Sequence, residues 1–153
     1  MRLLIVSDSH SYYSTLENIL KRERSADMII HLGDHADDMN MMTEFTEQKA
    51  VLICRGNCDI YGSDHAEQHV FEAEGKKILC CHGHRYHVKD GMYALYSAGR
   101  EQGAELCLFG HTHYSFVEEE NGITLLNPGA VCNGEYATVD ITNGKIVITQ
   151  KTI

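Results

Sequence analysis

Five short segments of the chain concentrate side chains that can bind metal ions: DSH (8–10), GD (33–34), GNCD (56–59), HGH (82–84) and GHTH (110–113). Their donors are carboxylate and amide oxygens and imidazole nitrogens. Such a mixture without thiolate favours Mn²⁺, Fe, Co, Ni or Zn²⁺ over Ca²⁺ or a cysteine-type zinc site. The candidate ligands are Asp8, His10, Asp34, Asn57, His82, His111 and His113.

The number of these ligands indicates two ions rather than one. A structural zinc takes four ligands, and seven are too many for it. They suit two ions that share a bridging carboxylate, which in hydrolytic sites lie about 3.5–4 Å apart. A competing interpretation is a separate zinc clip within CCHGHRYH (80–87), but Cys80 and Cys81 end an apolar run and are better placed in a strand.

Each of the five segments directly follows a short apolar run, at 3–6, 28–32, 51–54, 78–81 and 106–109. Continuous apolar runs of this length are typical of strands buried on both faces of a sheet. In α/β sheets, ligands bind at the carboxyl ends of the strands. We therefore expect the five segments to converge on one place.

The stretches between several of these runs show helical spacing. It predicts helices around 16–20, 39–45 and 92–99, the first with Ser14 and Glu17 as a capping box. Alternation of strands and helices predicts a largely parallel sheet covered by helices.

The last forty residues have a different character. Asn-Gly pairs at 121–122 and 143–144 stand between strand-like segments, which is a strong hairpin signal. Residues 135–141 and 145–153 are therefore expected to form paired antiparallel strands, either in a second sheet or as an antiparallel extension of the first. The sequence thus predicts an α/β fold with a two-layer β core flanked by helices, in a single domain spanning 1–153.

Composition narrows the class of protein. Hydrophobic residues make up 43% and charged residues 23% of the 153 residues, as in soluble globular proteins. The opening apolar run is too short for a signal peptide or membrane span, so we expect a cytoplasmic protein with reduced cysteines. A net charge of −9 disfavours nucleic acid as a partner. Homo-oligomerisation is left open.

In this order, the five segments resemble the signature of the calcineurin-like metallophosphoesterases. Their spacing and the small size of the chain resemble the short phosphodiesterase branch of bacteria and archaea, and the match runs from Met1 through LLNPGA (125–130). The resemblance implies a four-layer αββα sandwich, in which two mixed β-sheets are flanked by helices.

The resemblance also implies a distribution of the ligands over two divalent ions, Mn²⁺ first and Ni, Co, Fe or Zn as alternatives. One ion would be held by Asp8, His10, Asp34 and His113, and the other by Asp34, Asn57, His82 and His111, with Asp34 as the bridge. The implied activity is phosphodiester hydrolysis of a small phosphorylated substrate by in-line attack of a metal-bridging hydroxide.

The GNCD segment departs from a common family pattern, since many relatives have His after the Asn. Here the residue is Cys58, and a thiol with an ordinary pKa near ~8.5 matches the needs of an alkoxide leaving group poorly. We therefore expect aryl leaving groups to depart faster than alkyl ones. His84 is a candidate for phosphate contact or proton donation, beside Asn57 and Cys58 as the other candidate catalytic residues.

Two other functions compete with a phosphodiesterase. The retromer subunit that resembles this fold is a scaffold that has lost part of its metal set, whereas all seven ligand positions are filled here. Larger superfamily members are nucleases, but they carry additional domains, and the acidity of this chain disfavours long polyanions.

Overall fold

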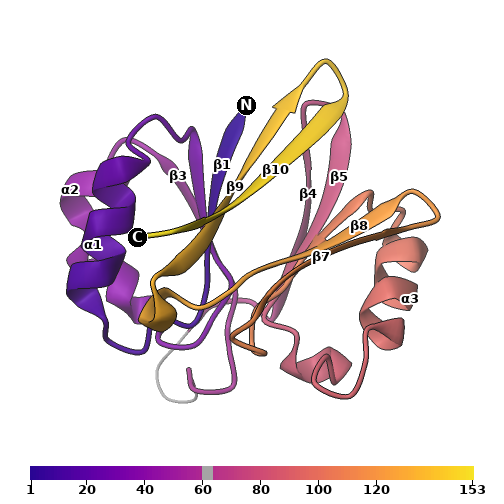
Figure 1. Ribbon diagram of the computed structural model, residues 1–153, viewed down its shortest axis with the longest axis horizontal. Helices are drawn as coiled ribbons and strands as arrows, with labels where there is room; N and C mark the ends of the chain where they lie inside the picture. Colours follow the sequence, from indigo (N-terminus) through magenta and orange to yellow (C-terminus); the bar gives the residue numbers. More distant parts are fainter. Residues whose placement is uncertain (60–63) are drawn as a thin grey trace.

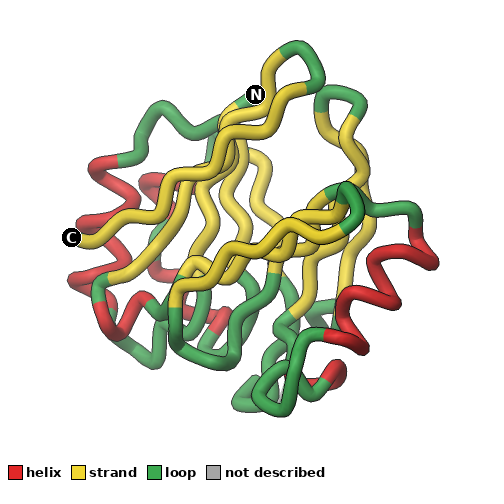
Figure 2. Tube along the Cα trace, turned by 45° about the vertical axis from the view of Figure 1, so that its right-hand side comes forward, coloured by secondary structure: helices red, strands yellow, loops and turns green. Residues whose placement is uncertain are grey.

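Two five-stranded β-sheets pack face to face in the computed structural model, which describes residues 1–59 and 64–153. Helices α1 (Tyr13–Arg22) and α2 (Thr43–Thr46) cover the outer face of one sheet, and α3 (Tyr93–Gln102) covers the outer face of the other (Figure 1, Figure 2). The layers therefore run helix, sheet, sheet, helix. The predicted αββα sandwich of two mixed sheets is confirmed.

The first sheet has the strand order β10-β9-β1-β2-β3. Its parallel half consists of β1 (Arg2–Val6), β2 (Met28–His31) and β3 (Ala50–Ile53). Its antiparallel half consists of β9 (Glu135–Thr142), which pairs with β1, and the edge strand β10 (Lys145–Thr152).

The second sheet has the strand order β4-β5-β6-β8-β7. The central strands β5 (Lys76–Cys81), β6 (Leu106–Leu108) and β8 (Ile123–Pro128) are parallel. The edge strands β4 (Gln68–Ala73) and β7 (Ser115–Glu120) are antiparallel to their neighbours. Both sheets thus have parallel strands whose carboxyl ends can present ligands.

Asn-Gly pairs form two of the hairpin turns, as predicted. Asn121-Gly122 joins β7 to β8 and Asn143-Gly144 joins β9 to β10, with positive φ at all four residues. A third hairpin, at Glu74-Gly75 between β4 and β5, was not predicted because it lacks the Asn-Gly signal.

Three α-helices and three 3₁₀-helices occur in the described residues. The α-helices are α1 (Tyr13–Arg22), α2 (Thr43–Thr46) and α3 (Tyr93–Gln102). The 3₁₀-helices are η1 (Ala36–Met41), η2 (His84–Tyr86) and η3 (Val131–Asn133).

The predicted capping box of the first helix is wrong. Helix α1 begins at Tyr13, its N-cap is Tyr12, and no side chain makes a capping hydrogen bond there. The Tyr12 amide donates to the Ser9 carbonyl at 2.8 Å, so the chain already turns before Ser14. Ser14 therefore lies inside the first turn rather than in front of it.

The single helix expected around 39–45 is also wrong, because the segment divides into η1 and α2 at Met42. Met39, Met42 and Phe45 are nevertheless buried in one cluster against the first sheet. The three-residue spacing found the buried face but not the helix type, since side chains three apart also share a face in a 3₁₀-helix.

Strand residues alternate between the core that separates the sheets and the cores beneath the helices. Ile5 faces the second sheet, whereas Leu4 packs under α1. In β5, Cys80 faces the first sheet, and Cys81 packs under α3. Burial raises the pKa of both thiols well above the ordinary value. The two cysteines thus lie in different apolar cores, which excludes the zinc clip within 80–87.

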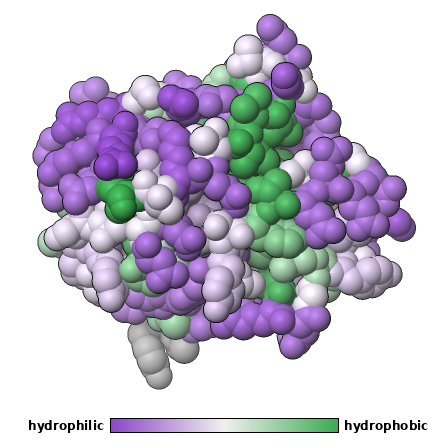
Figure 3. Space-filling model, in the orientation of Figure 1, coloured by the Kyte–Doolittle hydropathy of each residue, from purple (hydrophilic) through white to green (hydrophobic). Residues whose placement is uncertain are grey.

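Most of the surface that faces the viewer in Figure 3 is hydrophilic, and apolar side chains gather along the seam between the sheets. Among the described residues, no helix is long and apolar enough to cross a membrane.

Candidate metal centre

Five strands of the two sheets end at the same edge of the sandwich, at the bottom of Figure 1. Asp8 follows β1, Asp34 follows β2 and Asn57 follows β3 in the first sheet. In the second sheet, His82 follows β5 and the loop with His111 follows β6. The two sheets therefore bring candidate ligands together from opposite sides.

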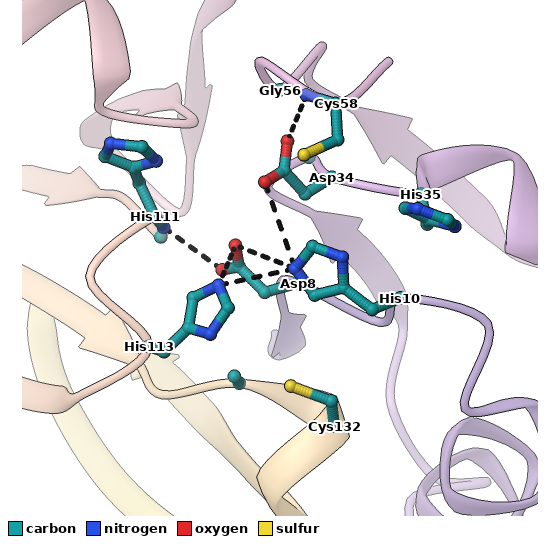
Figure 4. A network of polar contacts seen from close by, with 12 residues as sticks. Asp8, His10, Asp34, His35, Gly56, Cys58, His111, His113 and Cys132 are labelled. Atoms are coloured by element: carbon teal, nitrogen blue, oxygen red, sulfur yellow. Dashed lines mark hydrogen bonds and ion pairs between the residues drawn. The ribbon is translucent and has the colours of Figure 1, made fainter.

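Asp8, His10, Asp34 and His113 form the first ligand group, in which one donor atom of each lies within 4.8 Å of the others. His113 Nε2 lies 3.1 Å from Asp8 Oδ1, and His10 Nε2 lies 3.9 Å from Asp34 Oδ2. Figure 4 shows these side chains pointing toward one another. The group offers two carboxylates and two imidazoles to one ion.

Asp34, His82 and His111 form the second ligand group by the same measure. His82 Nε2 lies 3.4 Å from Asp34 Oδ2, and the rings of His82 and His111 are 5.0 Å apart. Asp34 belongs to both groups, which is the position that a bridging carboxylate requires.

Asn57 is exposed, and its Nδ2 lies 3.4 Å from Cys58 Sγ. The turn that carries it is tied to the second group by its backbone, since the Cys58 amide donates to Asp34 Oδ1 at 2.7 Å. Asn57 thus stands beside the second group, and its role as a ligand remains a proposal.

Two buried atoms of this centre that could bind a metal ion, Asp8 Oδ1 and His82 Nε2, make no hydrogen bond within the described residues. Leaving such atoms unsatisfied costs free energy, on the order of 1–3 kcal/mol each. His82 Nδ1 donates to the Leu32 carbonyl at 2.9 Å, so Nε2 faces the centre. Burial lowers the pKa of His82, but its contacts with Asp34 and Asp8 outweigh it and raise the pKa above the ordinary value, so a metal ion would displace a proton from Nε2. A divalent cation would satisfy both atoms, and the residues present therefore fit metal ions.

The charge states of Asp34 and His111 also suit a metal. Burial raises the pKa of Asp34, but contacts with His82 and Cys58 outweigh it and hold the pKa well below the ordinary value. Burial and the nearby His82 and Lys89 lower the pKa of His111 to about 4. The pair therefore offers a carboxylate and a neutral imidazole, which are the forms that bind metals.

Backbone strain is concentrated at the candidate ligands. Non-glycine residues rarely adopt the left-handed region, which costs about 1–3 kcal/mol for each residue. Five of the seven candidates nevertheless have φ between 42° and 69°: Asp8, His10, Asp34, His111 and His113. The surrounding fold holds these residues in turns that aim their side chains at one point.

Glycines beside the ligands allow the strand ends to approach one another. A Cβ at Gly56 would lie 2.2 Å from Asp34 Oδ1, and a Cβ at Gly110 would lie 1.9 Å from Ser7 Oγ. Real Cβ atoms do not occur this close to other heavy atoms. Glycine is therefore required at these two positions by the packing of the centre.

The sequence profile of the calcineurin-like phosphoesterase superfamily domain matches residues 1–144. The chain belongs to this superfamily. A probable metallophosphoesterase of Bacillus subtilis is 34% identical over 132 residues, which cover 86% of this chain and 75% of that protein. A phosphodiesterase of Methanocaldococcus jannaschii is 24% identical over 153 residues, covering 86% of this chain and 85% of that protein.

Solved structures of other proteins share the fold of this phosphoesterase. A conserved protein from Streptococcus pneumoniae, described as a predicted phosphoesterase, has a TM-score of 0.82 at 26% identity and covers 99% of this chain and 88% of its own. Zinc-bound Vps29 from Entamoeba histolytica has a TM-score of 0.79 at 18% identity and covers 99% of both chains. At that identity, the second likeness shows the fold alone.

Two aspartates of the phosphoesterase hydrogen-bond to the loops that carry the candidate ligands. Asp59 accepts hydrogen bonds from the amides of Asp34, Ala36 and Gly56 at 2.8–3.1 Å. The buried Asp38 accepts from Ser9 Oγ at 2.7 Å and was not predicted. Its place in an acidic, helix-like segment gave no sign of this contact.

His31, the last residue of β2, is fully buried, and both of its ring nitrogens are hydrogen-bonded. The Gly33 amide donates to its Nδ1 at 3.1 Å, so Nε2–H points to Ser9 Oγ at 3.2 Å. Burial is the main reason why its pKa is lowered to about 4. His31 therefore supports the loop after β2 as a neutral side chain.

Asn127, near the end of β8, is a further support, and like Asp38 it was not predicted as an individual residue. It is fully buried, and its Nδ2 donates to the Gly110 carbonyl at 2.8 Å and to Thr112 Oγ1 at 3.0 Å. Its Oδ1 accepts from the Gly129 amide at 2.9 Å. One amide therefore fixes the loop that carries His111 and His113.

Replacing Asn127 with Ala is expected to lower the free energy of unfolding by about 2–3 kcal/mol, because buried partners lose their hydrogen bonds. We also expect weaker metal binding, since the loop 110–113 is released. Urea denaturation and metal titration would measure both effects. Asn133→Ala is the matched control, because its exposed amide donates to the His113 carbonyl at 3.3 Å. Equal metal affinity in the two variants would contradict the role given to Asn127.

The candidate catalytic side chains Cys58 and His84 border the second ligand group. Cys58 is exposed, and partial burial together with Asp34 raises the pKa of its thiol to about 11. The His84 ring lies 5.3 Å from the His82 ring and 6.1 Å from that of His111. His84 thus lies beside the second ligand group but outside it.

Proposed function

We propose that this phosphoesterase hydrolyses small phosphodiesters, with two divalent ions held by the two ligand groups and Asn57 as a further ligand of the second ion. The observation that carries the proposal is Asp34, which belongs to both groups. The 24% identical phosphodiesterase of M. jannaschii supports the choice of diesters over other phosphate esters. We propose Mn²⁺ as the first metal to test, followed by Ni, Co, Fe and Zn.

The chain's own residues would bind the substrate and offset part of the positive charge of the metal ions. Bound divalent ions would supply a nucleophile at neutral pH and stabilise the charge that develops on the phosphate oxygens. Asp8 and Asp34 offset part of the charge of the ions. Asn57 and His84 line the same hollow beside the centre and can donate to a phosphate oxygen. We assign protonation of the leaving oxygen to His84 or Cys58.

Hydrolysis of bis-p-nitrophenyl phosphate and of p-nitrophenyl phosphate would test the proposal. We expect metal-free protein to be inactive, and protein reloaded with Mn²⁺, Ni²⁺, Co²⁺ or Zn²⁺ to cleave the diester at least about tenfold faster than the monoester, which corresponds to 1.4 kcal/mol in the barrier. Protein kept in chelator is the control. Absence of turnover with every metal, in protein shown to bind two ions, would overturn the proposal and favour a scaffold.

A further inference from the structure

A hollow of about 370 Å³ opens beside the second ligand group. Asn57 and His84 line the part next to that group, and Arg55, Glu67 and Arg85 line the remainder. The proposed function uses Asn57 and His84 but gives no role to the two arginines. They stand out because the chain as a whole carries a charge of −9.

Glu67 holds both guanidinium groups in the hollow. It forms ion pairs with Arg55 and, at 3.0 Å, with Arg85, and its Oε2 lies 3.6 Å from His84 Nε2. Burial raises the pKa of Glu67, but the two arginines outweigh it and lower the pKa below the ordinary value. One carboxylate is therefore shared by two permanent cations.

The guanidinium groups keep donors for a ligand. Each has five N–H donors, and Glu67 is the one side-chain partner of either group within the described residues. The other acid of the hollow, Asp59, is occupied by backbone amides. The planar fork of arginine matches the geometry of phosphate, and Glu67 orients the forks before a ligand arrives.

A purely structural role explains Arg85 poorly. Its side chain is 66% exposed, and ion pairs at such exposed positions contribute little to stability. Contacts run instead from the ligand His82 to His84 and from His84 to Glu67, so that two side chains connect the arginines to the ligand centre.

We propose that Arg55 and Arg85 form an anion subsite for a second phosphate of the substrate, so that the natural substrates are small phosphodiesters that carry an additional phosphomonoester. This inference rests on the proposed function, because the scissile diester is placed at the ligand groups. The subsite selects among diesters and leaves the bond that is cleaved unchanged.

Two matched substrates would test the subsite: thymidine 5′-(p-nitrophenyl phosphate) and the same compound with a 3′-phosphate. With Mn²⁺-loaded protein we expect a higher kcat/KM for the 3′-phosphorylated diester. In Arg85→Met this preference should fall about tenfold, the effect of one charge-assisted hydrogen bond. Arg85→Lys should retain part of it. Arg24→Met, which removes an exposed arginine paired with Glu44, is the control. A preference unchanged in Arg85→Met would overturn the inference.

Binding provides a readout that is independent of turnover. Calorimetry on the Mn²⁺-loaded protein should give a lower Kd for thymidine 3′,5′-bisphosphate than for thymidine 5′-monophosphate, and Arg85→Met should remove most of the difference. Equal Kd values in the unmodified protein would overturn the subsite. If the protein cleaves neither diester yet binds the bisphosphate selectively, the proposed function fails and the subsite stands.

Discussion

Asp34→Asn is expected to reduce kcat/KM for bis-p-nitrophenyl phosphate by at least about a thousandfold, which corresponds to about 4 kcal/mol in the barrier. The reason is that Asp34 is common to both ligand groups, so one substitution weakens both sites. An asparagine keeps the size of the side chain and can still accept the hydrogen bond from the Cys58 amide. Loss of the negative charge is therefore the main change.

Metal content should change together with activity. We expect calorimetry to show two bound ions in the unmodified protein and fewer in Asp34→Asn, with an unchanged circular dichroism spectrum. Asp37→Asn is the matched control, because Asp37 is exposed and belongs to neither ligand group. An Asp34→Asn protein that keeps both ions and full turnover would refute the assignment of Asp34 as the bridge.

Gly33→Ala should lower the free energy of unfolding by about 3 kcal/mol or more and disable the centre. Gly33 has φ +110°, which strains any L-residue, and a Cβ there would lie 2.6 Å from the Gly56 amide nitrogen. It would also lie 2.9 Å from His82 Nδ1. Urea denaturation would measure the loss of stability, and metal titration would measure the damage to the centre.

Gly75→Ala separates backbone strain from crowding. Gly75 also has positive φ, at +75°, but no heavy atom lies within 4 Å of the position that a Cβ would take. This variant should therefore cost only about 1–2 kcal/mol and should bind metal normally. If both variants lose the same stability, the close packing around Gly33 is not what requires glycine there.

The architecture could be predicted because the sequence marks it locally. Apolar runs gave the strands that are buried on both faces, and the Asn-Gly pairs gave two hairpins. The short helical segment between β2 and β3 was predicted less well, since the spacing of Met39, Met42 and Phe45 fits an α-helix and a 3₁₀-helix equally. The start of α1 depended on a backbone turn at Ser9, which no helix-capping pattern encodes.

The candidate ligands could be found because each stands next to a strand end, and strand ends are visible in the sequence. The residues that hydrogen-bond to the ligand loops and hold them in place were harder to predict. Asp38 and Asn127 act on segments that are distant in the chain, Asn127 through the carbonyl of Gly110 and Asp38 through the hydroxyl of Ser9. Such partners depend on how the sheets meet, and a single sequence does not show that.

The distribution of the ligands over the two sheets links metal supply to the integrity of the sandwich. Asp8, His10 and Asp34 come from the first sheet, and His82, His111 and His113 come from the second. An ion bound by both sets would act as a cross-link between the halves. Each tenfold rise in free metal above its Kd would then add about 1.4 kcal/mol per ion to the stability of the folded state. A cell starved of this metal would lose folded protein as well as activity.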